Sequence, residues 1–90
     1  MRFRESTQAT VTRWTEYRTP SGRWSKVKYD LEESDYTSAA LTRFFSWRMP
    51  RERRQYAYFR EGYLPRRVTV VSPDWTMRNV YLFKYRTEEE

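Results

Sequence analysis

Trp24, Lys26 and Lys28 follow one another at intervals of two residues. This spacing brings an indole and two ammonium groups to the same face of an extended strand. A face that combines aromatic rings with cations can stack a nucleic-acid base while it neutralises phosphates. Tryptophan, tyrosine and arginine are also the residues enriched at the hot spots of protein interfaces. The pattern therefore predicts a binding surface, for nucleic acid or for a protein.

Arginine supplies most of the positive charge and is clustered in two further places. Lysine and arginine number 18 against 12 aspartate and glutamate residues, which gives a formal net charge of +6. One cluster is Arg51, Arg53 and Arg54, and the other is Arg66 and Arg67. Cations near a helix C-terminus are favourable in themselves, so capping accounts for part of the first cluster. The surplus predicts an anionic partner, because guanidinium groups bind phosphate and carboxylate through a planar fork.

The absence of cysteine and histidine excludes several classes of site. Disulfides, the usual zinc and iron–sulfur centres, a histidine base and a cysteine nucleophile are all ruled out. A short acidic patch contains Asp30, Glu32, Glu33 and Asp35, without the spacing of a calcium loop or a two-metal site. We interpret it as negative charge that favours the start of the following helix. We therefore expect no enzyme, no cofactor and no metal.

The alternating tryptophan and lysines lie in a predicted β-hairpin over residues 9–31. Two runs rich in β-branched and aromatic residues flank Pro20, Ser21 and Gly22. These three residues suit a type I turn that is closed by a residue with positive φ. The hairpin is the element that must position the basic and aromatic side chains.

The length of the turn decides which face each side chain occupies. A three-residue turn places Arg18 opposite Trp24, Glu16 opposite Lys26 and Trp14 opposite Lys28. Its outward face then carries Trp14, Arg18, Trp24, Lys26 and Lys28. A two-residue turn would instead bring Trp14 inside and Tyr17 outside, because a slip of one residue exchanges the two faces. Trp24 shares its face with the lysines in both registers.

A helix is predicted over Ser34–Met49, the run with a helical period. Apolar residues recur there at steps of three and four: Tyr36, Ala40, Leu41, Phe44 and Trp47. Ser34 or Asp35 can cap its start, and Pro50 ends it. We expect the resulting stripe to cover one face of a sheet.

Further strands are predicted after the helix. Residues 55–60 alternate tyrosine with alanine and phenylalanine, residues 68–72 read VTVVS, and a turn follows at residues 72–74, with Trp75 near its tip. Residues 79–86 carry Val80 and Leu82 on one face and aromatic rings on the other, which is typical of a central strand. The chain is thus predicted to be an α+β protein of order β-β-α-β-β-β. Its antiparallel sheet of about five strands has one helix packed on one face.

One helix cannot cover both faces of such a sheet, so an exposed aromatic and basic face is expected. The 33% charged residues would suit disorder, but the 19% aromatic content indicates a folded domain. We predict a single domain over residues 9–86, a flexible arm over 1–8 and a disordered acidic tail over 87–90. The first residues lack the apolar core of a signal peptide, and no run is long enough to span a membrane, so we expect a cytoplasmic protein.

These observations favour a small, non-catalytic, basic protein that binds nucleic acid, DNA or RNA, through a sheet face and an arginine-rich loop. The alternative is a protein-binding inhibitor or adaptor, including a homodimer, that uses the same surface against an acidic partner. In size and composition the chain is similar in type to small phage proteins that block a host nucleic-acid enzyme, such as a CRISPR or restriction effector. The residues predicted to bind are Trp14, Tyr17, Arg18, Trp24, Lys26, Lys28, Arg51, Arg53, Arg54, Arg66 and Arg67.

Overall fold

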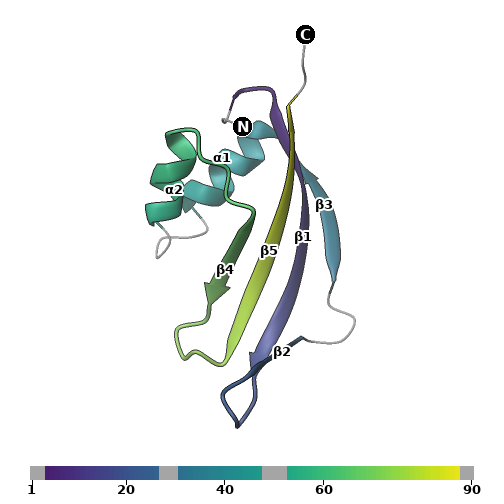
Figure 1. The fold of residues 1–90 in the computed structure, drawn as a ribbon, viewed down its shortest axis with the longest axis vertical. Coiled ribbons are helices and arrows are strands. Elements are labelled where there is room, and N and C mark those ends of the chain that lie inside the picture. The colour runs from purple at the N-terminus through teal and green to yellow at the C-terminus, as the bar shows by residue number, and fades with distance from the viewer. Residues whose placement is uncertain (1–3, 27–30, 48–52, 88–90) are drawn as a thin grey trace.

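The computed structural model describes residues 4–26, 31–47 and 53–87 as a five-stranded antiparallel sheet with two helices on one side (Figure 1). This confirms the predicted α+β class and the antiparallel sheet. In chain order the elements are β1 (Thr7–Arg18), β2 (Trp24–Lys26), β3 (Glu32–Tyr36), α1 (Ser38–Trp47), α2 (Arg53–Arg60), β4 (Arg67–Val71) and β5 (Met77–Thr87). β1 begins within the residues predicted as an arm, and β5 ends at the first residue of the predicted tail.

The strands are ordered β2-β1-β5-β4, and β3 pairs with β1 along the same edge as β2. β2 lies against residues 16–18 of β1, and β3 lies against residues 9–13. β5 is central, as predicted, because it pairs with β1 on one side and with β4 on the other. Both long strands extend past the helices toward the β1–β2 and β4–β5 turns (Figure 1).

The β1–β2 hairpin has the register of the three-residue turn. Arg18 pairs with Trp24 and Glu16 pairs with Lys26, as predicted. Gly22 has a φ of 87°, a value that favours glycine, and its N–H donates to the Thr19 carbonyl at 2.9 Å. The two-residue alternative is therefore wrong. The predicted pairing of Trp14 with Lys28 lies outside the described residues.

The strand predicted over residues 55–60 is wrong, because this segment is helix α2. The helix directs Phe59 inward, where it is fully buried and stacks on Phe45 with 4.6 Å between ring centroids. Tyr56, three residues earlier, packs against the same core. A short aromatic segment fits both a period of two and a period of 3.6, and burial against α1 selects the helix. The sheet is thus covered by two helices instead of one.

The helix predicted from residue 34 begins later, at Ser38. Thr37 caps it, since the Ala40 N–H donates to Thr37 Oγ1 at 3.1 Å. Residues 34–36 belong to β3, so the proposed caps Ser34 and Asp35 are wrong. Tyr36 nevertheless packs against the core, with 6.1 Å between the centroids of its ring and the Phe44 ring.

The acidic patch does not precede the helix as a capping charge but forms an exposed edge strand. Glu32, Glu33 and Asp35 lie in β3, and the first turn of α1 contains no acidic residue. Glu32 forms an ion pair with Arg13 (3.0 Å), and Asp35 forms one with Arg86 (3.6 Å). Charges on an edge strand discourage pairing with foreign strands. The remaining member of the patch, Asp30, lies outside the described residues.

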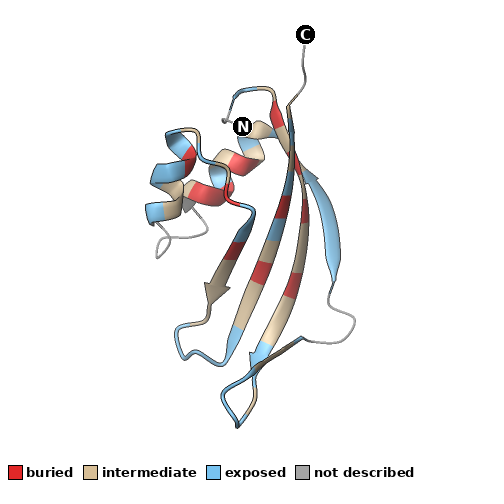
Figure 2. Ribbon diagram, viewed as in Figure 1, coloured by how far each residue is buried: buried red, intermediate tan, exposed pale blue. Residues whose placement is uncertain are grey.

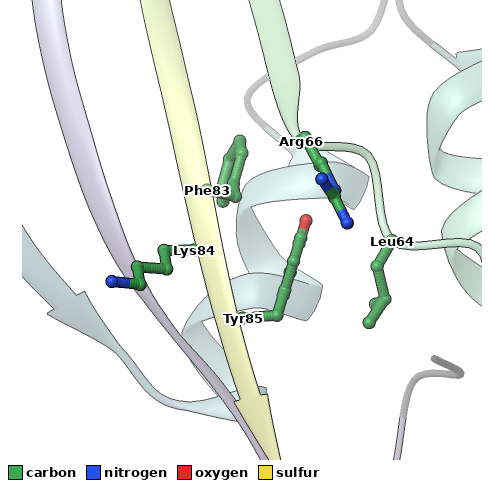
Figure 3. Close-up of a pocket in the computed structure, with 5 residues that line it drawn as sticks. All are labelled: Leu64, Arg66, Phe83, Lys84 and Tyr85. Carbon is green, nitrogen blue, oxygen red and sulfur yellow. The ribbon is translucent and has the colours of Figure 1, made fainter.

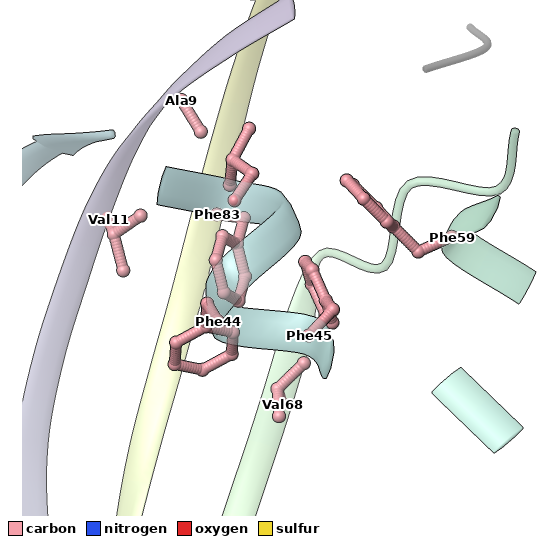
Figure 4. Packing of buried hydrophobic residues seen from close by; sticks show 8 residues of the cluster. Ala9, Val11, Phe44, Phe45, Phe59, Val68 and Phe83 are labelled. Atoms are coloured by element: carbon pink, nitrogen blue, oxygen red, sulfur yellow. The ribbon is translucent and has the colours of Figure 1, made fainter. Parts of the chain in front are cut away.

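The main hydrophobic core lies between the helices and the upper half of the sheet (Figures 2 and 4). Phe44 is its centre. The centroid of its ring lies 4.7 Å from that of Tyr81, 5.2 Å from that of Phe45 and 5.4 Å from that of Phe83, in edge-to-face geometry. Such pairs add to the free energy of area burial by about 0.5–1.5 kcal/mol each. A small domain has few other sources of stability.

Phe44→Ala is therefore expected to lower the free energy of unfolding by about 3–5 kcal/mol, the usual cost of truncating a buried aromatic residue. This approaches the whole stability of a typical small domain. Leu31→Ala is the control, since Leu31 is 58% exposed. Urea unfolding followed by circular dichroism measures the free energy of unfolding of both variants. Equal midpoints for Phe44→Ala and the native protein would show that the Phe44 ring does not stabilise the fold to this extent.

Candidate binding site on the open face of the sheet

The two faces of the sheet differ in what covers them. Ala9, Val11, Val68 and Phe83 point to the side on which α1 and α2 pack. Side chains alternate along a strand, so their neighbours point to the opposite side, where no described helix lies (Figure 1). We call this side the open face. Its paired positions are Gln8, Thr10, Thr12, Trp14, Glu16 and Arg18 of β1, Trp24 and Lys26 of β2, Glu33 and Asp35 of β3, Arg67, Thr69 and Val71 of β4, and Arg78, Val80, Leu82, Lys84 and Arg86 of β5.

Glu16 binds two side chains at the distal end of the open face, by which we mean the end beyond the helices, near the β1–β2 turn (Figure 1). Its Oε1 accepts a hydrogen bond from Arg78 Nε at 2.7 Å, within an ion pair of 2.6 Å. Its Oε2 accepts a hydrogen bond from the Trp14 indole Nε1–H at 2.8 Å. Only 13% of the Glu16 side chain is exposed. The carboxylate thus fixes one cation and one indole from two neighbouring strands.

Cations rest on both indoles of this region. Lys26 Nζ lies 4.5 Å from the centroid of the Trp14 ring. Arg78 Cζ lies 4.4 Å from the Trp24 ring, and Arg18 Cζ lies 5.9 Å from the same ring. These distances are those of cation–π interactions, which contribute about 0.5–1 kcal/mol at exposed sites. We call Trp14, Glu16, Arg18, Trp24, Lys26 and Arg78 the indole–cation cluster.

The side chains of the indole–cation cluster differ in how far they are buried. Trp14 is 9% exposed, and Val80, directly opposite on β5, is fully buried, although both belong to the open face. Trp24 is half-buried, whereas Arg18 and Lys26 are exposed. The result is a small second apolar centre beneath a layer of positive charge, with the cations reachable from solvent.

Glu16 is held in its charged form by this environment. Burial raises the pKa of Glu16. Hydrogen bonds from Trp14 and Arg78, together with the charges of Arg78 and Arg67, lower it by more than burial raises it. The pKa is therefore below its usual value of 4.5. The cluster therefore keeps its internal ion pair at neutral pH.

The structure brings together five of the residues predicted to bind: Trp14, Arg18, Trp24, Lys26 and Arg67 all lie on the open face.

It places three others elsewhere. Tyr17 is exposed on the opposite face, Arg54 is exposed on α2, and Arg66 precedes β4 on the side of the helices. Arg53 begins α2, but its side chain is not described, and Lys28 and Arg51 lie outside the described residues. The predicted arginine-rich loop thus does not join the hairpin residues at one described site.

Arg78 was not among the predicted residues, although it links Glu16 to Trp24. Lys84 adds a further exposed cation on the same face. Both lie on β5, whose presence the sequence indicates. Their position beside the hairpin depends on the register of β5 against β1, two strands that are far apart in the chain. No local pattern of residues encodes that register.

A hollow of about 370 Å³ lies on the side of the helices, between β5 and the segment before β4 (Figure 3). Leu64, Phe83 and Tyr85 give it apolar walls, and Arg66 and Lys84 also line it. Tyr85 is occupied structurally: its hydroxyl donates to the Pro65 carbonyl at 2.6 Å, and burial, together with Tyr63, raises its pKa. The hollow thus offers two cations, and no carboxylate is among its lining residues.

Among the residues that the structure describes, no three acidic side chains gather where they could hold a metal ion. Across the described segments, no helix has the length and apolar character needed to cross a membrane. Comparisons with protein-family models, curated proteins and solved structures found no significant match to this chain.

Glu16→Gln is expected to destabilise the protein by on the order of 1 kcal/mol at about pH 7, because it removes the ion pair with Arg78. The pKa of Glu16 is lowered in the folded state, so this contribution is present above pH 4.5 and is lost as the pH falls through the folded-state pKa. The native and variant unfolding curves should therefore converge at an acidic pH below the folded-state pKa.

Glu33→Gln provides the matched control, since Glu33 is an exposed carboxylate of the same face on β3. It should change the free energy of unfolding by less than about 0.5 kcal/mol at either pH. Urea unfolding at the two pH values measures both variants. A gap between native protein and Glu16→Gln that stays constant with pH would contradict a stabilising ion pair.

Proposed function

We propose that this protein binds nucleic acid through the open face of its sheet, with exposed cations against the phosphate backbone. The observation that carries the proposal is the indole–cation cluster. Arg18 and Lys26 reach solvent while each lies over an indole, and the one carboxylate in the cluster, Glu16, is already paired with Arg78. Arg67 adds charge on the same face at β4. An anion that approaches this surface meets positive charge without a competing free carboxylate in the cluster.

Support by the rings matters because flexible cations are costly to order. Fixing a lysine or arginine side chain costs up to about 1.5–2 kcal/mol of conformational entropy. A cation already held on an indole has lost part of that freedom before the partner arrives. Preorganisation of this kind raises affinity by lowering the cost of binding.

Trp24 supplies the contact to bases in this proposal. The ring is half-buried and has a guanidinium beside it, and both indole and guanidinium planes stack on unpaired bases. Both described helices lie on the other side of the sheet (Figure 1), so the open face has no described helix to enter a major groove. The surface therefore suits contact with the backbone and with unpaired bases, tolerant of sequence.

A second candidate is an acidic protein surface, bound in the manner of an inhibitor or adaptor. It is favoured by exposed apolar side chains at the distal end of the molecule. Tyr17 is 44% exposed and Met77, directly opposite it, is 47% exposed, while Trp75 in the β4–β5 turn is 56% exposed. Exposed aromatic and methionine side chains near charge are typical of protein interfaces.

Arg18→Gln is expected to weaken binding to fluorescent oligonucleotides and to lower the salt dependence of binding. Loss of one phosphate contact should reduce the slope of log K against log salt by about 0.9 for duplex DNA and about 0.7 for single strands. Fluorescence polarisation across a salt series measures both quantities.

Arg60→Gln is the matched control, because it removes one exposed arginine from α2 on the other side of the sheet. It should leave both affinity and slope close to those of the native protein. Absence of binding at low salt, or equal losses in the two variants, would overturn the proposal. In the first case, binding to an acidic protein surface becomes the remaining candidate.

A further inference from the structure

β4 forms one edge of the described sheet, and its backbone has a partner strand on one side only. Two hydrogen bonds fix which residues face that partner. The Phe83 N–H donates to the Arg66 carbonyl at 2.9 Å, and the Ser72 N–H donates to the Met77 carbonyl at 2.8 Å. In an antiparallel ladder the bonded residues alternate with residues whose backbone groups point the other way.

Arg67, Thr69 and Val71 are the alternate residues of β4. Their N–H and C=O groups therefore point away from β5, toward the free edge. Within the described part of the chain, these groups have no backbone partner. A row of outward donors and acceptors is the template to which another strand can add.

The two edges of the sheet differ in how they are protected. On the β3 side, Glu32, Glu33 and Asp35 place three carboxylates along five residues. β4 carries one charge, Arg67, at its first position. The residues that follow, Val68 to Ser72, include neither a charged residue nor a proline, and four of these five are β-branched. Charge and proline are the usual means of discouraging strand addition, and this segment has neither.

We infer that β4 pairs with β4 of a second copy of this chain, antiparallel and centred on Thr69. In this register Thr69 lies opposite its own symmetry mate, and Arg67 lies opposite Val71 of the second copy in both directions. Every outward backbone group of the three residues then has a partner. A two-fold axis at Thr69 makes the contact self-complementary and closed.

The charges at the two ends of the segment favour this second copy as the occupant. Arg66 would lie opposite Ser72 of the second copy, beside the β4–β5 turn that carries its Asp74, so that unlike charges come near each other at both ends of the segment. Asp74 is anionic, because hydrogen bonds from the Thr76 and Ser72 hydroxyls lower its pKa. A parallel pairing in register would instead bring Arg67 against Arg67.

The inference does not depend on nucleic-acid binding. The two-fold axis would stand perpendicular to the sheet, so the helices of both copies would lie on one side and both open faces on the other. Two sheets of five described strands would become one continuous sheet. The proposed binding surface would then be doubled without a change in either copy.

Thr69→Cys tests the register directly, since the chain contains no cysteine. Opposed residues of a hydrogen-bonded antiparallel pair have Cα atoms about 5.5 Å apart, within the range of about 4.4–6.8 Å that a disulfide spans. Thr12→Cys is the control, because Thr12 lies on the same face but on the interior strand β1. Mild oxidation should cross-link Thr69→Cys to a dimer on a non-reducing gel and leave Thr12→Cys monomeric.

Sedimentation equilibrium of the native protein tests the association without modification. The mass should rise from 11.3 kDa toward twice that value as the concentration approaches about 1 mM. Thr69→Lys places like charges opposite each other at the two-fold axis and should weaken association by about tenfold or more, with an unchanged circular dichroism spectrum. A native protein that stays monomeric, a Thr69→Lys protein that dimerises equally, or equal cross-linking of the two cysteine variants overturns the inference.

Discussion

The pairing of β1 with β5 is the interaction on which the rest of the structure depends. It runs without a break from Thr7 opposite Thr87 to Tyr17 opposite Met77. Because side chains alternate, this one register sends Val11 and Phe83 toward the helices and Trp14, Glu16 and Arg78 toward the open face. A slip of one residue would exchange these sets, bury the charges and expose the rings. The core and the candidate binding site are thus two sides of the same ladder.

The helical layer is too small to cover the whole sheet, and the chain stabilises the two ends differently. Near the helices, aromatic residues on α1, α2 and β5 interlock, with Phe44 at the centre and Phe59 stacked on Phe45. Beyond them, Trp14 shields Val80 and is itself shielded by Lys26. Ionic and cation–π contacts around Glu16 complete this smaller centre, which no helix of the described structure covers. The positive charge of this surface thus lies over buried apolar side chains. Long cationic side chains allow this arrangement, because their hydrocarbon stems pack on apolar groups while their charged heads stay in water.

Local patterns were sufficient for several parts of the fold and insufficient for others. The turn residues Pro20, Ser21 and Gly22 indicate the hairpin but leave two registers open, of which the structure selects the three-residue turn. Apolar residues on both faces mark β5 as central. Residues 55–60 were misread because six aromatic-rich residues fit both a strand and a helix, and only burial against Phe45 distinguishes them. β3 was misread because acidic residues before a helix suit capping as well as an edge strand. Five of the predicted binding residues share the open face, but Arg78 depends on a long-range register that no short pattern encodes.

The contact between cations and indoles also gives the molecule an optical property. Trp14 donates to a carboxylate beneath an ammonium group, and Trp24 lies against a guanidinium. The emission of an indole responds to the electric field across its ring, and Lys26 and Arg78 lie over these two rings and contribute to that field. An anion that draws either cation toward itself alters the field and with it the colour and intensity of the fluorescence. An anion bound at this face would therefore change the protein's own tryptophan fluorescence, without a label.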